Sequence, residues 1–116
     1  LLSSETKDII GKKEMEMMKN SAYLFNTARG GIIDEEALVK ALDDGQIQGA
    51  AIDATILEPP GSDHPLVMHD KVLVTPHIAA NSDEAMSRMA AMAAQEIVRV
   101  LSGQKPFNIV NPEIYQ

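Results

Sequence analysis

Three short apolar runs, separated by helical patterns and turns, are the feature that most constrains the fold. They occupy residues 22–26, 47–52 and 72–74. Continuous apolar runs of this length are typical of strands in a parallel sheet that is covered on both faces. Because the intervening segments supply the crossovers that parallel strands need, the order predicts an α/β fold. Three strands make a thin sheet, so we expect one half of a doubly wound, Rossmann-like parallel-sheet fold.

Two helices are predicted from their capping residues and apolar spacing. The first begins at Asp34, a good N-cap followed by two glutamates, and ends at Gly45. The second begins at Asn81, where Glu84 three residues later completes a capping box. Its apolar stripe recurs every 3.6 residues, which predicts a face packed in the core. Upstream, residues 3–19 predict two short helical turns divided by a glycine.

Composition excludes several classes of function. The chain has 116 residues, room for one domain, and its 17 acidic against 10 basic side chains give a net charge of −7. A nucleic-acid partner is therefore not expected. There is no cysteine, which excludes disulfides and thiol catalysis, and no apolar run of membrane-spanning length. Because no targeting segment is visible, we expect a cytoplasmic protein, either processed at Leu1 or cut from a longer chain.

Chemically active side chains follow each of the three predicted strands. Arg29 follows the first, Asp53 and Glu58 follow the second, and His77 follows the third. Ligands bind at the carboxyl ends of the strands in open α/β sheets. We therefore expect these four side chains to converge on one edge of the sheet.

Histidine, carboxylate and arginine together suit one type of reaction. Histidine exchanges protons near neutral pH, and a neighbouring carboxylate orients the ring and favours its charged form. Arginine binds a carboxylate through two hydrogen bonds, which would fix an α-hydroxy or α-keto acid. The implied chemistry is proton transfer at a hydroxyl or carbonyl group beside a carboxylate.

Each of these residues also has a purely structural interpretation. Arg29 could form a surface ion pair, and His77 could be a core histidine with both nitrogens bonded. Asp53 could cap a turn, and Glu58 could be an ordinary loop charge. Residue types alone leave these alternatives open.

A metal site is a competing interpretation of the histidines. His64, His69 and His77 lie close together in the sequence, with Asp63 and Asp70 beside them. Their spacings of five and eight match no compact helical ligand pair, and we place His64 and His69 in a loop. We therefore expect no metal.

Several ordered motifs resemble one family over essentially the whole chain. They are Ser4-Glu5-Thr6, Met18-Lys19, the stretch NTARGGIIDE at residues 26–35, Ala51-Ile52-Asp53, Glu58-Pro59, His64-Pro65-Leu66 and Thr75-Pro76-His77-Ile78. The chain resembles the C-terminal portion of the NAD-dependent D-2-hydroxyacid dehydrogenases, a family that includes phosphoglycerate dehydrogenase and glyoxylate or hydroxypyruvate reductase.

The resemblance implies a role for each catalytic candidate. It assigns Arg29 to the substrate carboxylate, His77 to acid/base work on the substrate oxygen, and Glu58 to tuning and orienting His77. The implied reaction is hydride transfer between a nicotinamide cofactor and a small D-2-hydroxy or 2-keto acid.

Cofactor contacts are implied in the same way. Asp53 would meet the nicotinamide carboxamide, and Thr27 and Ala28 would lie along the nicotinamide ring, with Arg29 and His77 beside it. The cofactor would be NAD. NADP stays open because the family's ribose-binding acidic residue precedes the matching region. No metal is implied.

The family's G-x-G-x-x-G turn, which holds the pyrophosphate, is missing from this sequence. We therefore expect residues 1–104 to be the C-terminal half of an NAD-binding domain and residues 105–116 to return toward an absent substrate domain. The isolated chain would be inactive, and the intact protein a homo-oligomer, a dimer. The alternative is a truncated, non-catalytic assembly or interaction module.

Overall fold

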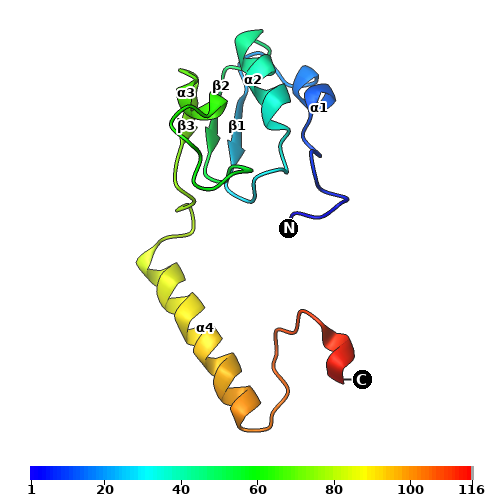
Figure 1. The fold of residues 1–116 in the computed structure, drawn as a ribbon, viewed down its shortest axis with the longest axis vertical. Helices are drawn as coiled ribbons and strands as arrows, with labels where there is room; N and C mark the ends of the chain where they lie inside the picture. Colours follow the sequence, from blue (N-terminus) through cyan, green and yellow to red (C-terminus); the bar gives the residue numbers. More distant parts are fainter. Residues whose placement is uncertain (116) are drawn as a thin grey trace. The chain divides into compact units, whose positions relative to one another are not determined.

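A computed structural model describes residues 1–115 and divides the chain into two compact units, residues 1–79 and 80–116. The first unit contains β1 (Tyr23–Asn26), β2 (Gly49–Ile52) and β3 (Val72–Val74), together with α1 (Lys12–Glu16), α2 (Glu35–Asp43) and α3 (Pro65–Met68). The second contains α4 (Asp83–Leu101) and the short 3-10 helix η1 (Pro112–Tyr115). Figure 1 shows this order along the chain.

The three strands form one parallel sheet in the order β1-β2-β3. The register aligns Asn26 with Ile52 and Ile52 with Val74, so all three strands end at the same level. The predicted α/β fold with a parallel sheet is thereby confirmed. This shared ending brings the three following loops to one edge.

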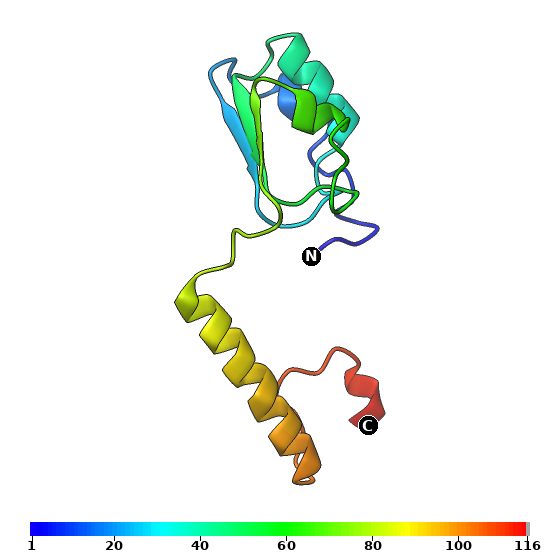
Figure 2. The same ribbon diagram turned by 60° about the vertical axis from the view of Figure 1, so that its left-hand side comes forward.

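The core lies between the sheet and the helices on one of its faces. Figure 2 shows α1, α2 and α3 on that face. Met15 of α1, Leu38 and Leu42 of α2 and Leu66 of α3 are fully buried, and Ile52 contributes from the sheet. Burying side chains of this size contributes roughly 1.5–3 kcal/mol each.

The other face of the sheet differs from our expectation. Tyr23, Phe25 and Leu73 are 61%, 69% and 64% exposed, so the first unit by itself covers only one face of the sheet and does not supply the cover on both faces that we expected. The physical reason is that α1, α2 and α3 all pack on the opposite face. An apolar run shows that a strand is suited to burial on both faces. It does not show which other element of the fold covers each face.

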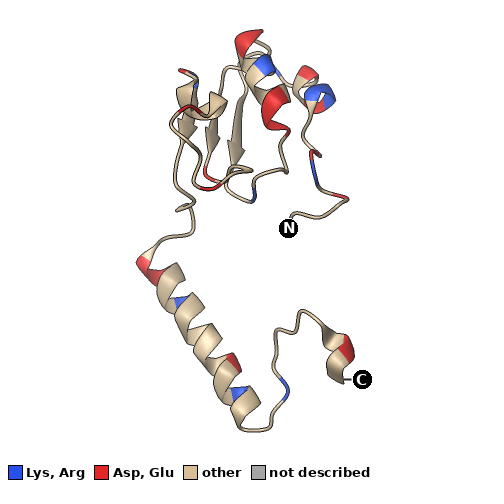
Figure 3. Ribbon diagram, viewed as in Figure 1, with Lys and Arg blue, Asp and Glu red and all other residues tan. Residues whose placement is uncertain are grey.

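The predicted caps of α2 are confirmed. The Asp34 side chain accepts a hydrogen bond from the Ala37 backbone N–H at 3.1 Å. Gly45 follows the helix with a φ of +68°, a left-handed conformation that favours glycine. Figure 3 shows the acidic residues at the beginning of this helix, where they favour its positive end.

Three local predictions need correction. The N-cap of α4 is Ser82, whose side chain accepts from the Ala85 N–H at 3.1 Å, and Asn81 lies one residue outside. Residues 65–68, between the two histidines that we expect in a loop, form α3, because Pro65 suits the first helical position and His64 caps it. Of the two expected turns before residue 19, only the second is a helix, α1, with Gly11 as its N-cap.

Residues 80–115 of the second unit contain no buried core. None of the residues of α4 is buried, so the prediction that its apolar stripe packs in a core is not met within the described residues. The following segment is held against the end of the helix. Glu96 accepts from the backbone N–H groups of Phe107 and Asn108, and the Arg99 guanidinium lies 3.6 Å from the centre of the Phe107 ring. Among the described residues, the helices are too short or too polar to cross a membrane.

Candidate functional site

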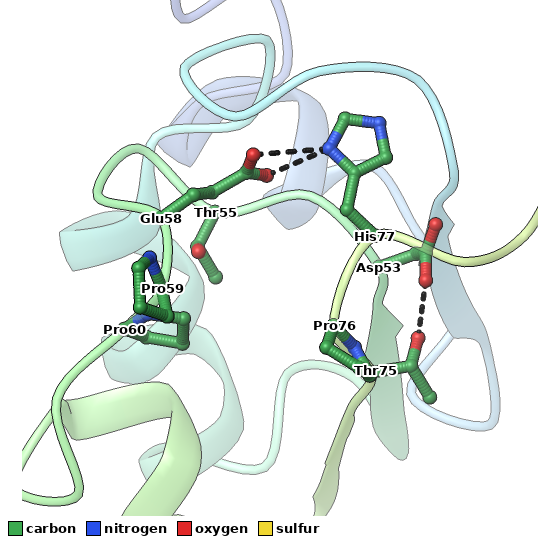
Figure 4. A pocket seen from close by; sticks show the side chains of 8 residues that line it. All are labelled: Asp53, Thr55, Glu58, Pro59, Pro60, Thr75, Pro76 and His77. Atoms are coloured by element: carbon green, nitrogen blue, oxygen red, sulfur yellow. Dashed lines mark hydrogen bonds and ion pairs between the residues drawn. The ribbon is translucent and has the colours of Figure 1, made fainter.

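The loops that follow the three strands meet at the carboxyl edge of the sheet. The loops after β2 and β3 border a pocket of about 330 Å³, whose lining is Asp53, Thr55, Glu58, Pro59, Pro60, Thr75, Pro76 and His77. Figure 4 shows Glu58 and His77 pointing toward each other from two of these loops. The convergence expected from the strand order is therefore present.

A buried asparagine shapes the turn that carries Arg29. The Asn26 side chain, at the end of β1, accepts from the Ala28 N–H at 3.0 Å and donates to the Arg29 carbonyl at 2.8 Å. Asn26 is only 6% exposed. Its role was missed from the sequence, although an asparagine at a strand end that bonds the backbone two residues on is a known turn signal.

The first two loops touch at Gly30. A Cβ atom added to Gly30 would lie 2.0 Å from the carbonyl oxygen of Thr55 and 2.1 Å from its carbonyl carbon. Only glycine permits this approach, because the opposing atoms are backbone and cannot rotate away. The contact locks the Arg29 turn against the loop that leads to Glu58.

Asp53 organises the third loop. One of its carboxylate oxygens accepts from the Thr75 hydroxyl at 2.6 Å and the Ile78 N–H at 2.9 Å. The other accepts from the Ala79 N–H at 2.8 Å. The hydrogen bond from Thr75 and those two backbone bonds lower the pKa of Asp53, since they stabilise the ionised form. Asp53 is only 5% exposed, and its carboxylate binds residues that precede and follow His77. It therefore supports the backbone on both sides of His77.

His77 is held in an unusual backbone conformation. Its φ is +52°, a left-handed value that is rare outside glycine, and its N–H donates to the Asp53 carbonyl at 2.9 Å. Strained backbone of this kind is found where the surrounding structure fixes a functional side chain. The conformation directs the ring toward Glu58, and Nδ1 lies 3.0 and 3.1 Å from the two carboxylate oxygens.

The partners of the ring assign its tautomer. A carboxylate only accepts hydrogen bonds, so Nδ1 of His77 carries a proton toward Glu58. A guanidinium only donates, so Nε2 presents its lone pair to Arg29 Nη1, which lies 3.4 Å away. In this arrangement Nδ1 is the donor nitrogen of the ring and Nε2 is the acceptor nitrogen that faces the arginine.

Arginine donors are available at the same place. Among residues 1–115, the guanidinium of Arg29 makes its hydrogen bonds through Nη1, to the Ala28 carbonyl and His77. Nε and Nη2 keep their donors for a ligand. Thr27 and Ala28 are exposed in the turn beside this group. Arg29, Glu58 and His77 are therefore brought together as expected, with Asp53 behind them.

The two other histidines belong to structural contacts. His64 Nε2 lies 3.4 Å from Glu35, and His69 Nε2 lies 3.4 Å from Asp43. Each therefore has a single carboxylate partner on α2. Within residues 1–115, no group of three or more His, Asp or Glu side chains is arranged to hold a metal ion.

The chain matches a known family model. Residues 1–79 match the model of the D-isomer specific 2-hydroxyacid dehydrogenase, NAD binding domain. The glyoxylate reductase of Thermofilum pendens is 47% identical over 113 residues, which cover 97% of this chain and 33% of that protein. The chain therefore spans about a third of the length of this relative.

Solved structures show the same relationship. The D-isomer specific 2-hydroxyacid dehydrogenase of Lactobacillus delbrueckii ssp. bulgaricus, solved with NAD, is 33% identical with a TM-score of 0.80, covering 94% of this chain and 37% of that one. The corresponding enzyme of Xanthobacter autotrophicus Py2, solved with NADPH, is 32% identical with a TM-score of 0.79, covering 99% and 47%. This chain belongs to the D-isomer specific 2-hydroxyacid dehydrogenase family, and residues 1–79 match its NAD-binding domain.

Proposed function

We propose that this chain is the catalytic third of an oxidoreductase that interconverts a small D-2-hydroxy acid and its 2-keto acid. The observation that carries the proposal is the row formed by Glu58, His77 and Arg29, in which one imidazole lies between a carboxylate and a guanidinium. A proton acceptor beside a carboxylate-binding group is what this reaction needs from the protein. Family membership supports the same reaction class.

Arg29 binds the substrate carboxylate. Its Nε and Nη2 donors form the planar fork that suits two parallel hydrogen bonds to a carboxylate. Because Nη1 lies 3.4 Å from His77 Nε2, a bound 2-hydroxy acid would place its hydroxyl oxygen close to the imidazole. This short distance supports a substrate whose reacting oxygen is on the carbon next to the carboxylate.

His77 moves the proton at that oxygen. In the oxidation direction, Nε2 accepts the hydroxyl proton as the C–H electron pair leaves with the hydride. The imidazolium that forms keeps its Nδ1 proton on Glu58, whose negative charge stabilises it. In the reduction direction, Nε2 returns the proton to the carbonyl oxygen.

A nicotinamide cofactor supplies or accepts the hydride when bound. The residues present fit its nicotinamide end: one oxygen of Asp53 has two donors, and the other has only the Ala79 N–H among the described residues. That second oxygen is suited to the carboxamide, and Thr27 and Ala28 would lie along the ring. The sequence has no glycine-rich pyrophosphate turn. NAD is the proposed cofactor, and the choice over NADP depends on residues outside this chain.

Activity requires the remaining two thirds of such an enzyme. We assign residues 1–104 to the C-terminal half of its NAD-binding domain and residues 105–116 to a tail that returns to a substrate domain. The complete enzyme would be a cytoplasmic homodimer. Holding cofactor and substrate together contributes as much as roughly 7–11 kcal/mol to lowering the barrier, and the isolated chain lacks the pyrophosphate contacts needed for this.

A chimera tests the proposal. The 113-residue region that aligns with the Thermofilum pendens relative would replace the matching third of that protein, and NADH oxidation with glyoxylate would be followed by absorbance. We expect turnover by the chimera and none by the 116-residue chain alone. A folded chimera that binds NADH without reducing glyoxylate, or steady turnover by the isolated chain, would contradict the proposal.

A further inference from the structure

Glu35, the first residue of α2, connects three segments of the first unit. Its Oε1 accepts a hydrogen bond from the backbone N–H of Ile56 at 2.8 Å. Its Oε2 lies 3.4 Å from Nε2 of His64. The Glu35 and His64 side chains are only 14% and 16% exposed, so this contact is largely protected from solvent.

His64 makes this contact in its neutral form. Its Nδ1 accepts from the backbone N–H of Leu66 at 3.3 Å, as the N-cap of α3. A backbone N–H only donates, so the ring proton resides on Nε2 and points to Glu35. Both ring nitrogens are thus used.

The two contacts flank Glu58 on its own loop. Ile56 precedes Glu58 by two residues and His64 follows it by six, and both are tied to the same Glu35 carboxylate. Glu35 begins α2, the helix that follows the turn carrying Arg29. Its contacts therefore join this turn to the loop that carries Glu58. Thr55 strengthens the same loop through a hydrogen bond from its hydroxyl to the Leu57 carbonyl at 2.7 Å.

We propose that Glu35 is a positioning residue that fixes the loop carrying Glu58 and thereby sets the Glu58–His77 contact. Glu35 is outside the residues that line the 330 Å³ pocket, so it acts through Glu58 and touches no reactant. The consequence for catalysis rests on the function proposed above. The geometric part of the inference concerns this chain alone.

Nuclear magnetic resonance of the 116-residue protein tests the geometric part. In Glu35→Ala, we expect the Ile56 amide to exchange about 10-fold to 100-fold faster, the effect of losing a hydrogen bond to a charged group. The ring ¹⁵N signals of His77 should move toward those of Glu58→Ala. Glu36→Ala is the matched control, because Glu36 is the next residue of the same helix turn, exposed, and without a side-chain hydrogen bond in residues 1–115.

Glu35→Gln separates the hydrogen bond from the charge. Its amide oxygen can still accept from the Ile56 N–H, so slow exchange and the His77 signals should be largely restored. Unchanged His77 signals in Glu35→Ala, with or without faster exchange at Ile56, would overturn the proposal. A Glu36→Ala effect equal to that of Glu35→Ala would also overturn it, because the cause would then be the stability of α2.

Kinetics in the chimera test the consequence for catalysis. Glu35→Ala should lower kcat about tenfold and leave the KM for NADH unchanged. When Glu58 has already been replaced by Ala, adding Glu35→Ala should lower kcat by less than about twofold. Equal factors in both backgrounds would show a structural role and overturn the proposal. If His77→Asn left the turnover intact, the proposed function would fail, whereas the result for the His77 signals would still decide whether Glu35 positions Glu58.

Discussion

Nη1 of Arg29 lies 3.4 Å from Nε2 of His77, although 47 residues separate the two in the sequence. The contact exists because β1 and β3 end at the same level on either side of β2. It places a carboxylate-binding group beside a proton acceptor. The spacing of these two groups is the basis of the predictions for substrate binding and proton transfer.

Arg29→Lys should raise the KM for glyoxylate about tenfold or more, with a smaller change in kcat. A lysine ammonium cannot reproduce the planar fork, so one of two hydrogen bonds to the substrate carboxylate is lost. Steady-state kinetics of the chimera give both constants. Arg88→Lys on α4 is the control, since Arg88 is exposed and is not among the residues that line the pocket. A KM within twofold of the parent would count against Arg29 as the carboxylate group.

Glu58→Gln should lower kcat for the reduction reaction. It should also move the upper limit of the pH range in which kcat is high to a lower pH. The amide oxygen can still accept from Nδ1 of His77, but the negative charge that stabilises the imidazolium is gone. The proton donor is then present only at lower pH. A pH profile of kcat measures the shift, with Glu36→Gln as control. An unshifted profile would mean that Glu58 only orients the ring.

Much of this site follows from the sequence because the carboxyl ends of parallel strands must meet at one edge. That rule alone brought Arg29, Asp53, Glu58 and His77 together. The cap at Asp34 and the glycine at position 45 likewise fixed α2 from local signals. These features depend on short-range conformational preferences or on topology.

Contacts that depend on exact loop geometry were not predictable. Glu35 bonds the backbone N–H of Ile56, whose position is set only after the two loops have folded. The helix α3 is four residues long, too short to show a period. Asn81 and Ser82 are both good N-caps, so their identity could not decide which one begins α4.

Gly30→Ala should destabilise the first unit by about 3 kcal/mol, because its Cβ would overlap the Thr55 backbone. Urea unfolding of the 116-residue chain measures the change. Gly11→Ala is the matched control, since its Cβ would meet its nearest neighbours at ordinary distances of 3.5 and 3.6 Å. Equal effects of the two substitutions would contradict the close approach between the Arg29 turn and the Glu58 loop.

Asp53→Asn should reduce the loss of unfolding free energy that occurs as the pH falls. Because hydrogen bonds lower the pKa of Asp53, its ionised form stabilises the fold above the ordinary carboxyl range, near pH 4. That contribution is lost as the pH falls through the lowered native pKa. Urea midpoints between pH 7 and pH 2 should therefore fall less steeply in the variant. In Asp63→Asn, a change in an exposed loop, the urea midpoint should fall with pH as steeply as in the parent. If the midpoint of Asp53→Asn also fell as steeply as in the parent, the stabilising role of ionised Asp53 would be refuted.

The most direct test of the account is the turnover of the His77→Asn chimera with NADH and glyoxylate at saturating concentrations. Proton transfer by a positioned side chain contributes roughly 10²–10⁴ in rate. We expect kcat to fall by about that factor while the dissociation constant for NADH, measured by fluorescence, stays within twofold. A kcat within twofold of the parent chimera would contradict His77 as the acid/base of this site.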